Sequence, residues 1–181
     1  IKLTQQQAIY KRTQQSLLSR FEVAEDTPKI YHRINPTGGN TDRLDFICHF
    51  CWRQKLIKRD PPGIRCSRAG QAWVQKSDAE KIVDIYNDWL ESCVSGNLPI
   101  VTAHSILQII QPERRVLLSS IQEQVSKFAP DAIWTQTLYS QLERSFINHL
   151  TYMGAVAVAR LRDDIAIQVT DLGRRLLSGE S

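Results

Sequence analysis

The sequence of 181 residues has no long hydrophobic run and only four cysteines. No stretch approaches the roughly 18 consecutive apolar residues of a membrane-spanning helix, and no signal-peptide core appears at the start. The cysteines, at 48, 51, 66 and 93, match neither the paired spacing of a zinc ribbon nor a dense disulfide framework. We therefore expect a cytoplasmic protein with reduced thiols and no membrane segment.

The short motifs of common catalytic and cofactor sites are also missing. Residues 36–40 read Pro-Thr-Gly-Gly-Asn, without the Gly-Lys-Ser/Thr of a phosphate loop. No nucleophile elbow, zincin motif or dinucleotide fingerprint occurs. Asp163-Asp164 is a carboxylate pair, but at the tip of a predicted hairpin it is more simply a turn. The sequence predicts no enzyme, no cofactor and no metal.

What is present is ordinary globular composition, with 42% hydrophobic and 23% charged residues. The length suits one larger domain or two small ones. The net charge of +4 and a pI near 9.0 permit nucleic acid as a partner. Because the chain begins at Ile1 and its single methionine is Met153, we expect a fragment or a processed product.

Apolar periodicity and capping residues predict a mostly helical protein with small β-hairpins, an α+β class. A first helix is predicted over residues 3–21, and Thr41 or Asp42 can cap the next. A hairpin around the turn at 60–63 and a second one around 162–164 follow from turn residues and alternation. The predicted helices are 3–21, 43–57, 79–95, 102–110, 113–128, 134–153 and 171–177.

Two parts of the sequence resemble each other. "FICHFCW" (46–52) lies over "FINHLTY" (146–152) at an offset of 100, and "IRCSRAGQAWV" (64–74) lies over "IQVTDLGRRLL" (167–177) at an offset of 103. Both copies share one order: a helix, a hairpin, and a Ser/Thr-x-x-Gly helix start. We expect Ser67 and Thr170 to cap those last helices, and Gly70 and Gly173 to allow close packing.

The segment "NHLTYMGAVAVARLRDDIAIQVTDLGRRLL" resembles the winged-helix domains of bacterial regulators and helicase-associated modules. In these families the helix before the hairpin lies in the DNA major groove, and the hairpin is the wing. The resemblance covers residues 132–178 well and 43–76 less completely. It implies tandem winged-helix units, with an N-terminal helix at 1–21, a first unit at 22–76 and a second at 77–181, and DNA binding in transcription regulation or within a larger machine.

In the second copy, the helical spacing predicts which side chains reach DNA. If Leu142, Phe146, Ile147 and Leu150 face inward, the opposite stripe can bond to base edges or phosphates. The candidates there are Arg144, Ser145, Asn148, His149 and Tyr152, with Arg160 and Arg162 on the hairpin. The first copy places Asp45 and Cys48 on the same stripe, which is a poor base-reading set.

Positive charge concentrates instead on the first copy. Residues 43–76 hold eight Lys and Arg against two acids, a net of +6 in a chain of +4. Such a cluster is either a solvated surface or a phosphate-binding one, since phosphate contacts need charge more than geometry. The candidates are Arg53, Lys55, Lys58, Arg59, Arg65 and Arg68.

The C-x-x-C of Cys48 and Cys51 allows a zinc, redox or purely structural interpretation. A zinc site needs further ligands, for which Cys66 and Cys93 are the candidates. The repeat argues against it, because Cys48 aligns with Asn148 and Cys51 with Thr151. Buried cysteine behaves as a small hydrophobic residue, so the structural interpretation is favoured.

A protein-interaction module built on the same fold is the alternative function. Residues 77–141 carry four Lys and Arg against eight acids, a net of −4. The apolar helix 79–95 could bind a protein partner or form a homodimer. By default the aromatic residues pack in the core or between helices: Trp73, Tyr86, Trp89, Trp134 and Tyr139.

Overall fold

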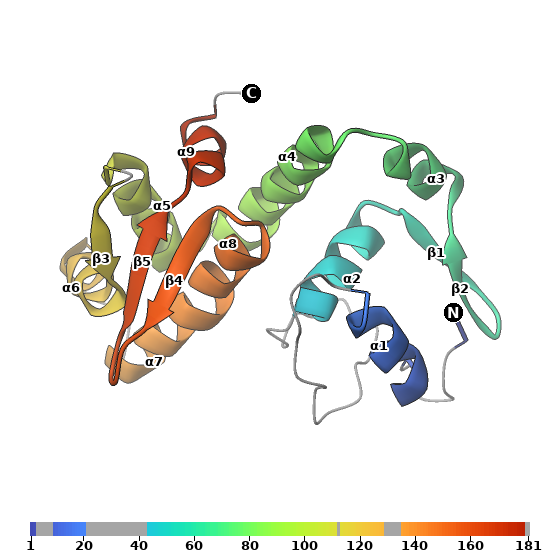
Figure 1. The fold of residues 1–181 in the computed structure, drawn as a ribbon, viewed down its shortest axis with the longest axis horizontal. Coiled ribbons are helices and arrows are strands. Elements are labelled where there is room, and N and C mark those ends of the chain that lie inside the picture. The colour runs from blue at the N-terminus through green and yellow to red at the C-terminus, as the bar shows by residue number, and fades with distance from the viewer. Residues whose placement is uncertain (3–8, 21–42, 112, 129–134, 180–181) are drawn as a thin grey trace. The chain divides into compact units, whose positions relative to one another are not determined.

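The computed structural model describes residues 1–2, 9–20, 43–111, 113–128 and 135–179 (Figure 1). The chain divides into two compact units, residues 1–77 and 78–181, and each is described by itself. Both consist of helices with a small antiparallel sheet, which confirms the predicted α+β class. None of the helices in these ranges has the length and apolarity needed to cross a membrane.

The first unit is a set of short helices around a two-stranded hairpin. Leu44 and Phe50 from its second helix and Ile64 from the hairpin are buried, and the Phe50 ring packs 5.3 Å from Trp73. The elements are α1 (Lys11–Leu18), α2 (Arg43–Arg53), β1 (Ile57–Asp60), β2 (Gly63–Cys66) and α3 (Arg68–Val74).

Two predicted helix boundaries in this unit are wrong. The predicted helix 3–21 is not continuous: α1 begins at Lys11 because Ile9 and Tyr10 are not helical, and residues 3–8 lie outside the described residues. The second helix ends at Arg53 and not at residue 57, since Lys55 turns to a positive φ of 55° and a strand follows. The predicted caps Thr41 and Asp42 lie outside the described residues.

The second unit packs its helices against a three-stranded sheet of order β3-β5-β4. Phe146, Leu150 and Ile167 are almost fully buried between helix and sheet. The elements are α4 (Asp78–Trp89), η1 (Leu90–Val94), α5 (Leu98–Ile109), β3 (Arg115–Leu117), α6 (Leu118–Phe128), α7 (Thr135–Gln141), η2 (Leu142–Ile147), α8 (Asn148–Tyr152), β4 (Val156–Arg160), β5 (Ile165–Val169) and α9 (Asp171–Ser178), where η marks π-helical turns.

The predicted helix 113–128 is wrong at its start. Residues 115–117 form β3, in which Val116 pairs with Ile167 of β5, and the helix begins only at Leu118. The hairpin predicted in residues 155–169 is confirmed as β4 and β5. A strand of three residues is too short to show an alternating apolar pattern in the sequence. Its extended conformation depends instead on pairing with a distant strand.

The Ser/Thr-x-x-Gly motif makes the same corner in both units. The Ser67 hydroxyl accepts from Gly70 N–H at 3.0 Å, and the Thr170 hydroxyl accepts from Gly173 N–H at 2.9 Å, which confirms both predicted caps. Ser67 N–H also donates to the Leu56 carbonyl (2.8 Å), as Thr170 N–H does to the Ala155 carbonyl (3.0 Å). The offset of 103 therefore holds for this part of the repeat.

The helix register of the repeat is 99, not the 100 predicted from the sequence. Leu56 N–H bonds to the Cys51 carbonyl, as Ala155 N–H bonds to the Leu150 carbonyl, both at 2.8 Å. Cys51 therefore corresponds to Leu150, not to Thr151. By the same offset, Cys48 corresponds to Ile147 rather than Asn148. Both cysteines stand where the second unit has buried apolar residues.

Candidate nucleic-acid interface

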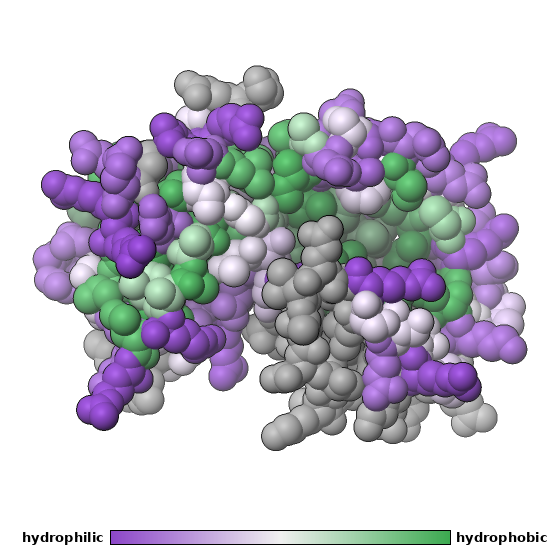
Figure 2. Space-filling model, in the orientation of Figure 1, coloured by the Kyte–Doolittle hydropathy of each residue, from purple (hydrophilic) through white to green (hydrophobic). Residues whose placement is uncertain are grey.

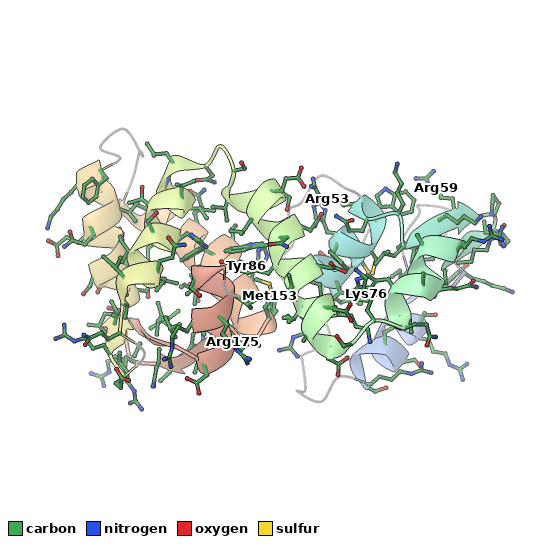
Figure 3. All side chains as sticks on the ribbon, turned by 90° about the horizontal axis from the view of Figure 1, so that it is seen from above. Arg53, Arg59, Lys76, Tyr86, Met153 and Arg175 are labelled. Carbon is green, nitrogen blue, oxygen red and sulfur yellow. The ribbon has the colours of Figure 1, made fainter. Side chains whose placement is uncertain are left out.

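The basic residues of the first unit come from the end of α2, both strands and the start of α3. A tight corner brings these segments together. The Ser67 N–H donates to the Leu56 carbonyl, and the Ser67 hydroxyl donates to the Lys55 carbonyl. In Figure 3, Arg53 and Arg59 project from the same edge of this unit, and Lys76 lies apart from them. All six predicted phosphate-binding residues are exposed: Arg53, Lys55, Lys58, Arg59, Arg65 and Arg68.

The hairpin β1-β2 divides its charges between two faces. Lys58 pairs with Arg65 across the strands, and Asp60 lies on the same face because side chains alternate along a strand. The Arg65 Nε is 3.1 Å from an Asp60 carboxylate oxygen. On the other face, the Arg59 guanidinium lies 5.8 Å from the centre of the Trp52 ring, a cation–π contact.

Four of the six cations form no ion pair in the described ranges, namely Arg59, which contacts the Trp52 ring, and three others. Lys55, Lys58 and Arg68 form no ion pair with any residue in the described ranges, whereas Arg65 has Asp60. Lys55 also holds a left-handed backbone conformation, which costs a non-glycine residue about 1 kcal/mol. The corresponding position in the second unit is Gly154, with φ of 73°. This corner thus carries a lysine where glycine would be the less strained residue.

In the second unit, the predicted outward position of His149 is wrong. Its side chain is only 9% exposed, and its Nδ1 accepts a hydrogen bond of 3.1 Å from the Trp89 indole. The stripe was derived for a regular helix, but the chain makes a π-helical turn from Leu142 to Ile147. The additional residue in that turn rotates the following residues, and it turns His149 toward α4.

The other predicted contacts of this helix and hairpin are at least partly exposed. Arg144 is exposed, and Ser145, Asn148 and Tyr152 are half-buried. On the hairpin, Arg162 is exposed, while the Arg160 guanidinium lies 3.2 Å from the Glu143 carboxylate. The unpaired cations of this surface among the described residues are therefore Arg144 and Arg162.

Asp164 has a role that the sequence did not reveal. Its Oδ1 accepts from Ser119 N–H at 3.2 Å, from the Tyr139 hydroxyl at 3.1 Å and from Ile165 N–H at 2.7 Å. Burial alone would raise the pKa of this carboxyl, but these hydrogen bonds and that of the Ser119 hydroxyl outweigh it and lower the pKa. The tip of the hairpin is thereby fixed to the start of α6 and to α7.

A buried aromatic cluster joins α4 to the rest of the second unit. The Trp89 ring stacks on Phe146 with centroids 5.8 Å apart, and the Tyr86 hydroxyl lies 2.7 Å from the His104 Nε2. Burial lowers the pKa of His104 and raises that of Tyr86. The default core positions of Tyr86 and Trp89 are confirmed, and Trp134 lies outside the described residues. This face of α4 is occupied within its own unit.

The C-x-x-C lies on α2, so its thiols are spaced along a helix. Burial raises the pKa of Cys48 to about 12, with Cys51 and Asp45 adding to the shift, and it raises the pKa of Cys51 to about 11. Metal ligation and redox chemistry both need the thiolate, which these values disfavour at neutral pH. Within the described ranges, no group of three His, Cys, Asp or Glu side chains could hold a metal.

Alkylation should therefore separate the cysteines. At neutral pH we expect iodoacetamide to modify the exposed Cys66 first, and Cys48 and Cys51 at rates at least about tenfold lower, because only the thiolate reacts. The two slow rates should still be rising at pH 10. Peptide mass spectrometry at timed intervals measures each site. Equal rates at Cys48 and Cys66 would contradict the burial of α2.

Searches of protein-family models, curated proteins and solved structures match nothing to this chain.

Proposed function

We propose that both units are winged helices and that the protein binds DNA without acting as an enzyme, as a regulator or as the DNA-engaging part of a larger machine. The order of elements in the second unit supports this: α5, β3, α6, the helix from α7 to α8, then the hairpin β4-β5. The sheet order β3-β5-β4 is the one in which the first strand pairs with the last.

The first unit supports the same proposal, because residues 1–2 bond to the free edge of β2. Ile64 exchanges backbone hydrogen bonds with Ile1, donating at 2.8 Å and accepting at 2.9 Å. At the offset of 103, Ile64 corresponds to Ile167, whose partner is Val116 of β3. Residues 1–2 therefore occupy the place of β3, and the first unit follows the order of the second from that strand onward.

The exposed cations of the first unit carry the functional proposal. Lys55, Lys58 and Arg68 have no carboxylate partner among the described residues, and the exposed Arg59 follows Lys58 on β1, on the other face of the hairpin. Their role is to neutralise phosphates, which supplies affinity without sequence preference. Arg144 and Asn148 on the second unit's helix then supply contacts to base edges, since Asn and Arg bond to adenine and guanine in the major groove.

A salt series on labelled DNA tests the proposal. The affinity of the chain for a duplex should fall with a slope of about −3 or steeper in log K against log salt, because each neutralised phosphate releases counterions. Fluorescence anisotropy with duplex and single-stranded probes measures it and shows which form is preferred. Absence of binding at low salt would exclude DNA as the partner.

A protein-interaction module remains the second candidate, and one observation favours it. Leu98 is 57% exposed and Ile109 is 82% exposed on α5, and Val101 lies between them along the helix. Large apolar side chains on one surface helix are typical of a docking site for another protein. This candidate predicts no salt-dependent DNA binding, so the same titration separates the two functions.

A further inference from the structure

Strand β4 is an open edge of the second unit's sheet. Two hydrogen bonds show which residues of the strand direct their backbone groups toward β5. Thr170 N–H donates to the Ala155 carbonyl, and Leu161 N–H donates to the Asp164 carbonyl. Because inward and outward bonding alternate along an antiparallel strand, Ala157 and Ala159 bond to β5. The N–H and C=O groups of Val156, Val158 and Arg160 therefore point outward, and within the described residues none of them has a backbone partner.

The strand lacks the features that normally protect such an edge. Residues 156–159 read Val-Ala-Val-Ala, without charge or proline, and Ala157, Val158 and Ala159 are exposed. Figure 2 shows apolar side chains over the lower part of this sheet. Exposed edges are usually blunted by lysine, proline or very short strands. An edge strand of five residues, of which the first four are apolar, is a template for another strand.

The corresponding edge of the first unit provides an internal comparison. Strand β1 occupies the place of β4, but it carries Lys58, Arg59 and Asp60 and is followed by Pro61 and Pro62. Charged side chains and proline oppose pairing with a further strand. The hairpin edge is thus protected against strand pairing in the first unit and unprotected in the second. The difference points to a pairing function of β4.

We propose that β4 pairs antiparallel with β4 of a second copy of this chain, across a two-fold axis at Val158. Val158 then faces its own counterpart, and Ala157 faces Ala159. The outward N–H and C=O groups of Val158 bond to those of the other Val158, and Val156 exchanges bonds with Arg160. A two-fold interface needs such a self-complementary surface.

Charge and packing favour a second copy as the occupant. In the antiparallel arrangement the two Arg160 side chains lie at opposite ends of the pair, and each already has Glu143 at 3.2 Å. No like charges therefore face each other. Val158 shares the inner face with Ile167, yet it is 41% exposed while Ile167 is buried. The second Val158 would cover this apolar side chain.

Self-association without DNA tests this inference independently of the DNA-binding proposal. Because one strand pair buries little area, we expect a weak dimer that forms over about 10 to 500 µM in sedimentation velocity. Over the same range, amide exchange by NMR should slow about tenfold or more at Val158 and Arg160. The amides of Ala157 and Ala159 should stay protected at every concentration, since they bond within the hairpin.

Two substitutions at one position separate strand pairing from other interfaces. Val158→Pro removes an outward N–H and no hydrogen bond within the sheet, and it should abolish the dimer, whereas Val158→Thr keeps that N–H and should preserve it. Thermal unfolding shows whether the proline variant is folded. If it is not, Val158→Lys is the second variant, because two lysines would then face each other.

Three results would overturn the inference. The first is a monomer at the highest concentration with Val158 and Arg160 amides in fast exchange, which would leave the edge to a strand of another protein. The second is a dimer that survives Val158→Pro or Val158→Lys, which would place the interface elsewhere, for example on residues 79–95. The third is a dimer in which only the inward amides are protected.

Discussion

Replacing Gly173 by alanine is expected to destabilise the second unit by about 3 kcal/mol or more. A Cβ at this position would lie 1.8 Å from the Ala155 carbonyl oxygen, and the nearest atoms are all backbone. That oxygen also accepts from Thr170 N–H, so it cannot withdraw without breaking the corner between α8 and β4. Helix α9 would have to move away, and its buried Leu176 and Leu177 would move with it.

Calorimetric unfolding measures this effect. For a unit of this size, a loss of about 3 kcal/mol lowers the midpoint by roughly 12 °C or more. Gly179→Ala at the other end of α9 is the matched control, because φ is 73° there but no atom lies within 4 Å of the added carbon. It should cost only about 1 kcal/mol. Equal effects of the two substitutions would show that close packing at Gly173 is unimportant.

The first unit offers the same substitution at Gly70. Its added carbon would lie 2.2 Å from the Leu56 carbonyl oxygen and 2.8 Å from the Cys66 sulfur. Gly70→Ala should therefore lower the unfolding midpoint of the first unit and leave that of the second. The pair of variants assigns the two transitions of the intact chain, provided that the units unfold separately.

These corners show how far the sequence could predict the fold. Ser67, Thr170 and their glycines form a local motif, because a cap and a close approach each depend on a residue and its near neighbours. The caps predicted at Ser67 and Thr170 and the two predicted hairpins were therefore confirmed. Strand β3 was missed, since its three residues take their conformation from β5, which lies about 50 residues further along the chain.

The candidate site was less predictable for the same reason. A period of 3.6 residues predicted an outward His149, but the chain makes the π-helical turn η2, and the His149 ring accepts a hydrogen bond from Trp89 of α4. Asp164 looked like a turn residue, while its carboxylate is held by Ser119 and Tyr139 from two distant helices. Contacts between remote segments leave no periodic signal. The charge cluster at residues 43–76, by contrast, could be counted directly.

Removing three of the unpaired cations of the first unit should have the largest effect on DNA binding. With Lys55, Lys58 and Arg68 all replaced by glutamine, we expect affinity for a duplex at 0.1 M salt to fall about 10²- to 10³-fold, and the salt slope to flatten by about 3, because each phosphate contact releases about 0.9 of a counterion. Fluorescence anisotropy across a salt series measures both. The loss should be similar for unrelated sequences, since phosphates carry no sequence information.

Arg65→Gln is the matched control on the same hairpin. Its guanidinium already lies 3.1 Å from Asp60, so removing it changes the local charge while leaving an acid behind. We expect a loss smaller than that of the triple variant and a slope change of about 1 or less. An unchanged affinity of the triple variant would place the phosphate contacts outside this surface.

A single substitution at Lys55 separates the charge from the backbone. Because Lys55 holds a left-handed conformation that Gly154 holds in the second unit, Lys55→Gly should stabilise the first unit by up to about 1 kcal/mol. The same change removes one phosphate contact and should weaken DNA binding about tenfold or less. If Lys55 served only the fold, its replacement would not raise the stability of the unit while lowering its affinity for DNA. Opposite signs in unfolding and binding would therefore identify the lysine charge as the reason for the strained conformation.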